Sequence, residues 1–585
     1  MNGPGPTAAP ARRRWLWALL ALLVVAWIAG VVILAVRIDR HIRAGIAAVS
    51  TAQANTDAIT ISNPNAPDLL APVSADFGAA RRDLDNPLLW PARWLPVAGR
   101  QIRAVRNLAA AAEQVGSIGQ TAIDQARAAL RAPHATGPQR VAAISALASA
   151  ASTADARLSK VSLGSRTALV GFVRRHYDDF ATRLAKVRAG VHKGAVAAKQ
   201  TATLFRGPSH LLLLAANNAE MRDGSGMFLS ATQVDVVDGK VTIGTVSDTA
   251  DLALPQSPVP LAAGYSAVWH PYLANEEWRN LGMSARFDET AAMAAAMWKA
   301  KTGQVVSGVM AIDIAGLQTL LVGTGPVEAA GTTVTPQNVT QLLMHDQYVG
   351  LTGDASDASR RDQLGRIADS VVQAVQRGGF DTAAVAKQMP ATVGGRHLLL
   401  WSADPTTEAA WQAAGVGGVL AGDTLLAAVQ NVGVNKLDQF LTVSTAVRVD
   451  PGSSTGVSAT FSLVNHTPPG EPGYIAGIGT AHVPPDTYLA LVTLTMPGSA
   501  GDVLVDGKPL ANNAGFDGPT RVVAVLRPVA PGANVRVTVT FTLPWPHGRL
   551  QVESAARLPS ATVSLATPSG SVTGAADDTR PAVAW

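Results

Sequence analysis

The sequence contains no cysteine and few charged residues. None of its 585 residues is cysteine, which excludes disulfide bonds, cysteine-ligated zinc, iron–sulfur clusters and thiol catalysis. Charged residues make up 15% of the chain, and the net charge of +5 is not gathered into a segment of dense Lys and Arg interleaved with aromatic residues. Because a nucleic-acid-binding surface needs such clustering, no nucleic-acid partner is expected.

Several catalytic signatures are missing as well. The sequence has no Walker P-loop, Rossmann glycine fingerprint, metalloprotease helix motif or Gly-x-Ser-x-Gly elbow. Its 11 histidines are scattered; His270 and His466 lie in turn-like contexts, and we interpret them as structural. What the chain does have is hydrophobic sequence, 48% of all residues, which is enough for several buried cores.

One apolar run is long enough to cross a membrane. Residues 15–36 contain no charge, and as a helix they would span ~33 Å at 1.5 Å per residue. Arginines flank both ends, and the absence of an acid before the run favours a cytoplasmic N-terminus. A cleaved signal peptide is the alternative, but its apolar region is normally about 7–15 residues. We expect an uncleaved, single-pass anchor in the cell membrane, with the bulk of the chain outside the cytoplasm.

The next region has the spacing of helices. Residues 37–206 repeat apolar residues every three to four positions, and Gly207-Pro208 should end the last helix. One break between helices, residues 85–100, contains Trp90 and Trp94 among several prolines. It fits a membrane-interface loop, but we favour a helix corner packed by the two rings.

From residue 210 onward, strands alternate with helices. The apolar runs 210–216 and 307–314 predict buried strands. Asp238-Gly239 predicts a two-residue hairpin between two further strands. Helices are expected at about 336–346 and 357–377, and a late strand at 396–404. This alternation is typical of an α/β domain.

The C-terminal part changes to a period of two. Apolar and polar residues alternate in several runs between 437 and 548, separated by Pro/Gly-rich turns, which predicts an all-β sandwich. The end is rich in Ser, Thr, Pro and Gly and is expected to be a disordered tail. The predicted organisation is a cytoplasmic tail 1–14, a transmembrane helix 15–36, a helical region 37–206, an α/β domain 207–436, a β-sandwich 437–548 and a disordered tail 549–585.

Five segments carry a family resemblance. The stretch LLLLAANNAEMRDGSGMFLSATQVDVVDGKVTIGTVSD (211–248) resembles a bacterial envelope family known as domain of unknown function 4012. The segments 278–287, 308–327, 396–402 and 435–440 strengthen the match. With the anchor and the β-rich end, the resemblance covers nearly the whole chain. It implies a cell-envelope protein but no activity, because the family is uncharacterised.

The α/β segment is also similar, more distantly, to the LytR-CpsA-Psr phosphotransferases. These membrane-anchored enzymes move glycan polymers from polyprenyl-pyrophosphate carriers to the cell wall. Arg222 matches the first Arg of the family's Arg-Ser-Asp-Thr string. Gly224 stands where its Asp belongs, although Asp223 is adjacent. Ser247-Asp248-Thr249 matches the end of the family's second string, whose Arg is a serine here.

A later segment matches the start of that family's arginine-bearing helix. Arg360 matches its first Arg, and Gln363 stands where the second belongs, with Arg361 and Arg366 close enough to compensate. The resemblance implies arginines that bind pyrophosphate oxygens in paired bonds, and carboxylates that hold a Mg²⁺ ion.

The implied site is an anion-binding crevice. Because residues at the strand ends of an open α/β sheet meet at one crevice, Arg222, Asp248 and Arg360 should converge on one point. Arg222, Arg360 and Arg361 are therefore the anion-binding candidates, and Asp248 and Asp223 the metal candidates; no catalytic residue can be named. In the alternative interpretation Glu220, Arg222, Asp223, Arg360 and Arg361 form ordinary surface ion pairs, each contributing about 0–1 kcal/mol.

Two functions stay open. We favour a non-catalytic binding or assembly module for an envelope glycan, a polyprenyl phosphate lipid or a protein partner that the sequence does not identify. The incomplete arginine set favours this interpretation, as does a C-terminal sandwich that phosphoryl chemistry does not require. The alternative is a magnesium-dependent phosphotransferase that moves a glycan from a polyprenyl-pyrophosphate carrier to the cell wall.

Overall fold

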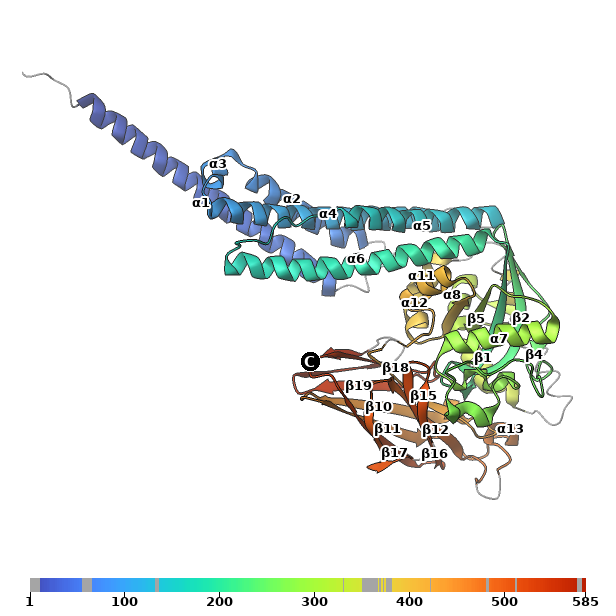
Figure 1. Ribbon diagram of the computed structural model, residues 1–585. Helices are drawn as coiled ribbons and strands as arrows, with labels where there is room; N and C mark the ends of the chain where they lie inside the picture. The colour runs from blue at the N-terminus through green and yellow to red at the C-terminus, as the bar shows by residue number, and fades with distance from the viewer. Residues whose placement is uncertain are drawn as a thin grey trace, which may run out of the picture. The chain divides into compact units, whose positions relative to one another are not determined.

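The chain forms two compact units (Figure 1). The first comprises Met1–Arg131 and Ala146–Ala198, and the second Ala132–Ser145 and Lys199–Trp585. A computed structural model describes residues 11–54, 66–131, 136–329, 331–349, 367, 370–371, 373–374, 381–420, 422–479, 483–510, 513–575 and 581–585.

The first unit is helical, as the apolar spacing predicts. Its last helix ends at Arg206, directly before Gly207-Pro208. The unit contains α1 (Ala11–Ala54), α2 (Ala66–Leu84), the short η2 (Pro87–Leu89) and α3 (Trp90–Arg93), α4 (Ala98–Arg131), most of α5 (Gly137–Ser159) and most of α6 (Gly171–Arg206).

Helix α1 has an exposed apolar part and a packed part. Within the described chain, its segment Leu22–Ala52 is the one helix that is long and apolar enough to cross a membrane. Leu23 and Ile33 belong to the exposed part. Leu34 and Ile38, by contrast, are buried against α2 and α4 in one hydrophobic cluster. The helix therefore joins the core of the first unit only from about its middle onward.

The corner between α2 and α4 is not built as expected. Leu89 is buried and packs with Leu84 and Leu34. Trp90 and Trp94, however, are 62% and 75% exposed, so the prediction of a corner packed by the two indole rings is wrong. The chain reverses within a few residues there, and the proline-containing short helices turn both rings away from the core.

The second unit begins with a mixed sheet in the order β3-β2-β1-β5-β8, with β4 paired to β2. Strand β1 is antiparallel to β2 and parallel to β5, and β5 is antiparallel to β8. Asp238 and Gly239 form the β2–β3 hairpin with φ of 47° and 72°, as a two-residue primed turn requires. The strands are β1 (Ser209–Met221), β2 (Gly226–Val237), β3 (Lys240–Ile243), β4 (Ser247–Asp248), β5 (Gly308–Ile312) and β8 (Leu398–Ser402).

The run of four leucines in β1 supplies apolar side chains to both faces of this sheet. Leu212 and Leu214 are fully buried on one face, in a core that includes Trp278 and Trp298. Leu213 points to the opposite face. Around the sheet lie η3 (Ala267–Tyr272), η4 (Trp278–Met283), α7 (Phe287–Thr302), α8 (Ile314–Thr324), β6 (Val327–Ala329), β7 (Thr332–Val334), α9 (Val339–Met344), η5 (Asp346–Tyr348), α11 (Thr382–Gly394) and α12 (Pro405–Ala413). Most of the helix expected at about 357–377 lies outside the described residues.

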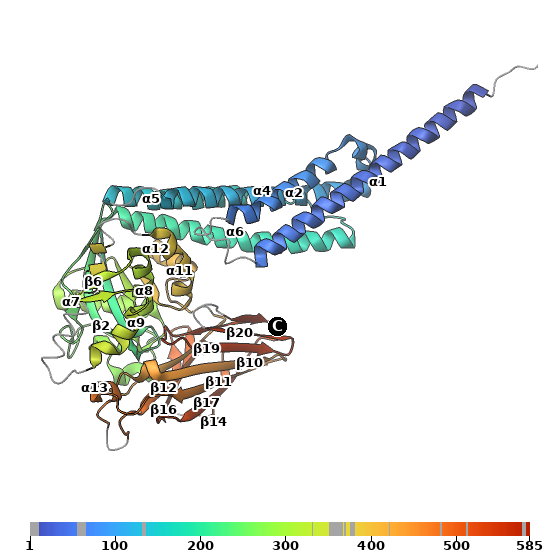
Figure 2. The same cartoon turned by 180° about the vertical axis from the view of Figure 1, so that it is seen from behind.

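Two further sheets form the β-rich C-terminal part (Figure 2). Their orders are β14-β13-β17-β11-β10-β19-β20 and β15-β16-β12-β9-β18-β21. Val429 and Val492 from one sheet and Phe461 from the other fill a common core, so the two sheets form a sandwich. The elements are β9 (Thr424–Asn431), η6 (Leu437–Phe440), β10 (Leu441–Asp450), β11 (Thr455–Asn465), α13 (Gly473–Ala476), β12 (Tyr488–Pro497), β13 (Gly501–Val505), β14 (Lys508–Pro509), β15 (Ala514–Asp517), β16 (Thr520–Val529) and β17 (Asn534–Leu543).

The end of the chain belongs to this sandwich. The prediction of a disordered tail is wrong for β18 (Arg549–Ser554), β19 (Thr562–Thr567), β20 (Gly570–Ala575) and β21 (Ala582–Ala584). Strand β19 pairs with β10, and its Val563 and Leu565 are buried in the shared core. In β19 apolar residues alternate with polar ones, and this pattern gives the strand a buried face although the surrounding sequence is polar. The sandwich thus extends beyond residues 437–548 on both sides, since β9 also belongs to it.

Candidate functional site

The polar residues that follow the apolar part of β1 are buried against the sandwich. Strand β1 continues to Met221, whose backbone N–H donates to the Asp438 carboxylate at 3.2 Å. Glu220 forms an ion pair of 2.7 Å with Lys436, and both side chains are about one-tenth exposed. Lys436 also lies over the rings of Tyr348 and Tyr474, 5.6 and 5.4 Å from their centroids. The charges at this strand end therefore connect the α/β sheet to the sandwich.

Arg222 and Asp223 lie in the turn between β1 and β2 and are both buried. The Arg222 guanidinium donates to the backbone oxygens of Met221 and Asn431, at 2.9 and 2.6 Å. Burial lowers the pKa of Arg222, although the nearby Glu220 and Asp438 raise it. Arg222, the residue predicted to bind an anion, thus already donates to two carbonyl groups of the protein.

Asp223 is the most perturbed carboxyl of this group. It is fully buried, and its Oδ1 accepts a hydrogen bond of 2.8 Å from Thr493 of β12. Burial raises the pKa of Asp223 to about 7, although the nearby Thr493 and Gln430 side chains lower it. Desolvation penalises the charged form more than these two polar neighbours stabilise it.

The other predicted site residues lie apart from this turn or outside the described chain. Asp248, in β4, pairs with Ser230, four residues along β2 from Gly226, or ~13 Å at about 3.3 Å per residue. It returns towards the start of β2, as the hairpin predicts, and its carboxylate accepts from the Ala250 N–H at 2.7 Å. Arg360 and Arg361 are outside the described residues, so their convergence with Arg222 stays a prediction.

The two carboxylates do not fit a magnesium site as they are placed. Asp223 is enclosed and hydrogen-bonded to Thr493, whereas Asp248 is half-buried on a different strand. Mg²⁺ needs oxygen ligands in near-octahedral geometry around one point. In the part of the chain that the structure describes, no group of three or more His, Asp or Glu side chains could hold a metal ion.

A second buried cluster, not predicted from the sequence, centres on Asp438. Arg557 donates to its Oδ1 at 2.8 Å, Tyr488 donates to the same oxygen at 2.7 Å, and Asn431 donates to Oδ2 at 2.9 Å. Asp438 and Arg557 come from η6 and from the segment after β18, 119 residues apart in sequence. Removal of one partner from such a pair is strongly destabilising, because the other charge stays buried. The cluster fastens β1, η6 and the C-terminal segment together.

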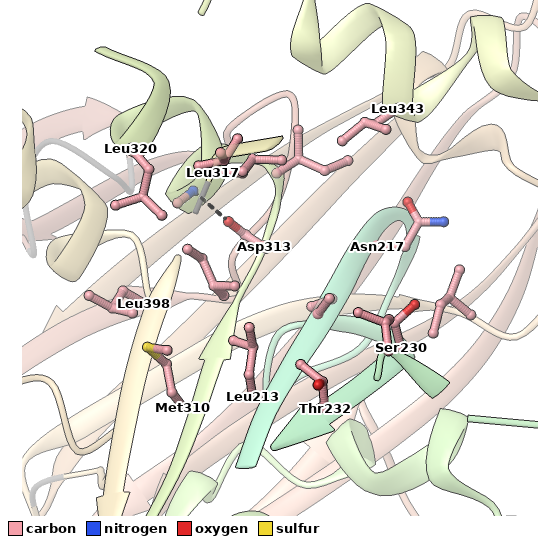
Figure 3. A pocket seen from close by; sticks show the side chains of 18 of the residues that line it. Leu213, Asn217, Ser230, Thr232, Met310, Asp313, Leu317, Leu320, Leu343 and Leu398 are labelled. Atoms are coloured by element: carbon pink, nitrogen blue, oxygen red, sulfur yellow. Dashed lines mark hydrogen bonds between the residues drawn. The ribbon is translucent and has the colours of Figure 1, made fainter. Parts of the chain in front are cut away.

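A cavity of about 280 Å³ lies on the face of the mixed sheet to which Leu213 points (Figure 3). Leu213, Met310 and Leu398, from β1, β5 and β8, form its floor. Leu317 and Leu320 of α8 approach from the opposite side. A helix layer over an apolar sheet face would normally close this space with side chains. Here the layers leave an apolar volume just below the range of about 300–1,000 Å³ that is typical of small-molecule sites.

Two polar residues in the cavity wall, Asp313 and Asn217, are hydrogen-bonded to other protein groups. Asp313 caps α8 by accepting from the Gly316 N–H at 3.0 Å (Figure 3). Its other oxygen accepts from Asn218 at 2.8 Å and contacts the His397 ring nitrogen at 2.6 Å. Asn217, also in the lining, donates to the Tyr348 hydroxyl at 2.6 Å. These groups hold the wall in place, and the remaining lining is dominated by Leu, Ile, Val, Met and Ala.

Part of the cavity can be predicted from local sequence patterns. The continuous apolar run of β1 indicates that both faces of the sheet are covered, but it cannot show that one cover is incomplete. Asp313 directly follows the buried strand β5 in the segment 308–327, which carries part of the family resemblance. Its capping role is typical of Asp before a helix.

The comparison with known families agrees with the resemblance seen in the sequence. Residues 206–348 match the model of a family described as a protein of unknown function (DUF4012). The matched part contains β1 to β5, α7, α8 and α9, and therefore much of the cavity wall. No curated protein matches the chain.

Proposed function

We propose that the protein is a membrane-anchored, non-catalytic binding module of the cell envelope, and that its α/β sheet holds part of the hydrocarbon chain of a polyprenyl phosphate carrier. The apolar cavity of about 280 Å³ is the observation that carries this proposal. Each Å² of apolar ligand surface that is buried contributes about 25 cal/mol to the binding free energy. A cavity lined mainly by apolar side chains therefore favours a hydrocarbon chain over a glycan. A glycan would leave its hydroxyl groups without partners there.

The anchor supports the choice of a membrane lipid. Segment Leu22–Ala52 is long and apolar enough to cross a bilayer, and a carrier with a long apolar chain resides in the same bilayer. The likeness of the α/β segment to enzymes that act on polyprenyl-linked glycans points to the same ligand class. We also propose that the α/β part has the same fold as the LytR-CpsA-Psr phosphotransferases.

We propose binding over phosphoryl transfer because of how the described candidate residues are engaged. A phosphotransferase needs Arg222 to contact an anion, but its Nη1 donates to the carbonyl groups of Met221 and Asn431, and its Nε is buried. It also needs a carboxylate that holds magnesium, and Asp223 is enclosed with a pKa of about 7.

The test is a substitution that fills the cavity. Ala215 of β1 lines it, and Ala215→Phe should lower affinity for a fluorescent polyprenyl phosphate at least about tenfold, which corresponds to ~1.4 kcal/mol. Binding is measured by fluorescence anisotropy with the detergent-solubilised full chain. Thr242→Phe is the matched control, because Thr242 is exposed on β3 between the lining residues Val241 and Ile243.

Two results would count against the proposal. One is equal affinity of the Ala215→Phe variant and the wild type for the polyprenyl phosphate. The other is binding of a fatty-acyl phospholipid as tightly as the polyprenyl phosphate, which would assign the cavity to membrane lipid in general.

A further inference from the structure

The corner between α2 and α4 carries apolar side chains that the first unit does not bury. Trp90, Trp94, Leu95 and Val97 are 62%, 75%, 58% and 66% exposed. The two indole rings contact one another edge to face, with centroids 6.1 Å apart. Tryptophan is enriched where proteins meet the membrane–water boundary, because its ring is apolar and its N–H is polar.

The corner contacts α1 within the apolar segment of that helix (Figure 1). The Trp27 indole N–H donates to the Leu88 carbonyl oxygen at 3.0 Å. The Leu88 side chain lies 3.4 Å from the position that a Cβ on Gly30 would occupy, so the two segments are in van der Waals contact. Gly30 and Trp27 precede Val36, the last residue of the charge-free run, by six and nine positions, or ~9 and ~14 Å along a helix. A membrane around α1 therefore covers the corner at least to the depth of about 5–10 Å that interfacial segments reach.

A second segment brings apolar side chains to the same end of the helical unit. Gln101, in the first turns of α4, donates to the Ala168 carbonyl and accepts from the Val170 N–H, both at 3.1 Å. Val170 and Phe172 are 46% and 65% exposed. The adjacent Ile102 packs against the cluster of Leu34 and Ile38, which places this contact beside the end of the charge-free run of α1.

Exposed arginines flank the apolar surface. Arg100 and Arg103 lie in the first turns of α4, beside Ile102. Arginine at this depth extends its charged end to lipid phosphate groups while its stem stays in apolar surroundings. The apolar corner would then face the acyl chains of the leaflet, and the neighbouring arginines would face its phosphate groups.

We infer that the corner residues Trp90, Trp94, Leu95 and Val97, together with Val170 and Phe172, insert into the leaflet from which α1 emerges. This inference rests on the proposed membrane anchor and adds a second attachment beside it. Because α1 and the corner contact each other inside the apolar span, one bilayer covers both. The helical unit is then held by an area of membrane surface, which restricts its tilt more than a single helix would.

The absence of cysteine makes depth measurements straightforward. Single cysteines at positions 95, 172, 187 and 25 (Leu95→Cys, Phe172→Cys, Val187→Cys and Val25→Cys) each give one site for an environment-sensitive fluorophore in the full chain. The proteins are placed in phospholipid vesicles that carry nitroxide groups on the acyl chains. Val187 is the matched control, because it is exposed on α6 fifteen residues beyond Phe172, or ~22 Å along the helix.

The inference predicts blue-shifted emission and nitroxide quenching at positions 95 and 172, and neither at 187. Position 25 lies inside the proposed membrane span, so it should be quenched by nitroxides deep in the acyl chains whether or not the corner inserts. If position 25 is quenched while 95 and 172 behave like 187, the inserted corner is overturned and the anchor stands. If position 25 is not quenched, the anchor fails and the inference fails with it. Blue-shifted emission at 95 and 172 without lipid quenching would mean that a protein contact covers the corner, and this also overturns the inference.

Discussion

At the scale of single residues, the carboxyl group of Asp223 has fewer donors around it than a carboxylate needs. Its Oδ1 accepts from Thr493, whereas Oδ2 is buried without a hydrogen-bond partner in the described structure. Gln430 lies beside it, and the Oε1 atom of Gln430 is also buried without a partner among the described residues. A proton on Oδ2 would remove the buried negative charge, in agreement with a pKa raised to about 7 by burial.

This proton gives a pH dependence of stability with a definite sign. The folded pKa of about 7 exceeds the ordinary value of 3.8, so between these values the folded chain binds more protons and loses stability as the pH rises. Asp223→Asn places a neutral polar group of nearly the same size at this buried position. We expect the variant to be more stable than the wild type at pH 8, by on the order of 4 kcal/mol at most, from about three pKa units at 1.36 kcal/mol each.

Thermal unfolding of the detergent-solubilised chain between pH 4.5 and 8 measures this effect. The difference between variant and wild type should grow with pH and be smallest near pH 4.5. Asp248→Asn, at a half-buried strand end, is the control and should follow the wild type. A constant difference across the pH range would show that Asp223 does not change its protonation on unfolding.

The candidate site residues at the end of β1 could be predicted from the sequence, but their burial against the sandwich could not. Arg222 and Asp223 were expected at an anion-binding crevice, or together with Glu220 in surface ion pairs, and in either case in contact with solvent. Their partners Asn431, Lys436 and Thr493 follow more than 200 positions later, and no local pattern relates the two sets. Distant contacts thus decided whether these charges meet a ligand or the protein itself.

At the scale of secondary-structure elements, hydrophobic periodicity predicted the strands correctly, whereas amino-acid composition did not. The alternation in β10, β11 and β17 and the Asp238-Gly239 hairpin were predicted from the sequence and are confirmed. Strands β18 to β21 were missed because their Ser, Thr, Gly and Pro content resembles that of a disordered segment. Only pairing with β9 and β10 gives these short strands a buried face.

Strand β19 therefore provides a test of the C-terminal part of the sandwich. Val563→Asp places a charge in the core, because Val563 is 1% exposed. We expect a loss of about 3–5 kcal/mol, the cost of a buried charge without a partner, measured as a lower thermal midpoint. Ser564→Asp, one residue on and facing the other side of the strand, should cost less than about 1 kcal/mol. Equal and negligible effects of both substitutions would restore the disordered-tail interpretation.

At the scale of the whole molecule, the α/β sheet and the sandwich behave as parts of one compact unit. The Asp438 cluster joins β1, η6 and the segment after β18, and residues 437–548 alone would lack β9, a central strand of its sheet. The cavity wall and the sandwich core are also linked, since Tyr348 lines the cavity and belongs to the sandwich cluster. A ligand in the cavity is therefore expected to stabilise the whole unit against unfolding.

The direction in which the chain crosses the membrane is the last property to predict. Three arginines precede the charge-free run, at positions 12–14, and three follow it. Of the latter, Arg37 is paired with Asp83 at 3.1 Å and Arg43 with Asp39 at 3.0 Å. The arginines before the run are therefore the better match to the anionic cytoplasmic surface. We expect residues 1–14 in the cytoplasm and the second unit outside it.

Fusion of alkaline phosphatase after Trp585 measures this orientation, because the reporter needs disulfide bonds that form outside the cytoplasm. The cysteine-free chain cannot mispair with the reporter. The wild-type fusion should be active, and a green fluorescent protein that folds only in the cytoplasm should be dark at the same position. Replacement of Arg12, Arg13 and Arg14 by Asn should lower the active fraction, because the arginines beyond the run then outnumber those before it. An inactive phosphatase fusion with a bright fluorescent one would place the α/β sheet, and its proposed lipid carrier, on the cytoplasmic side.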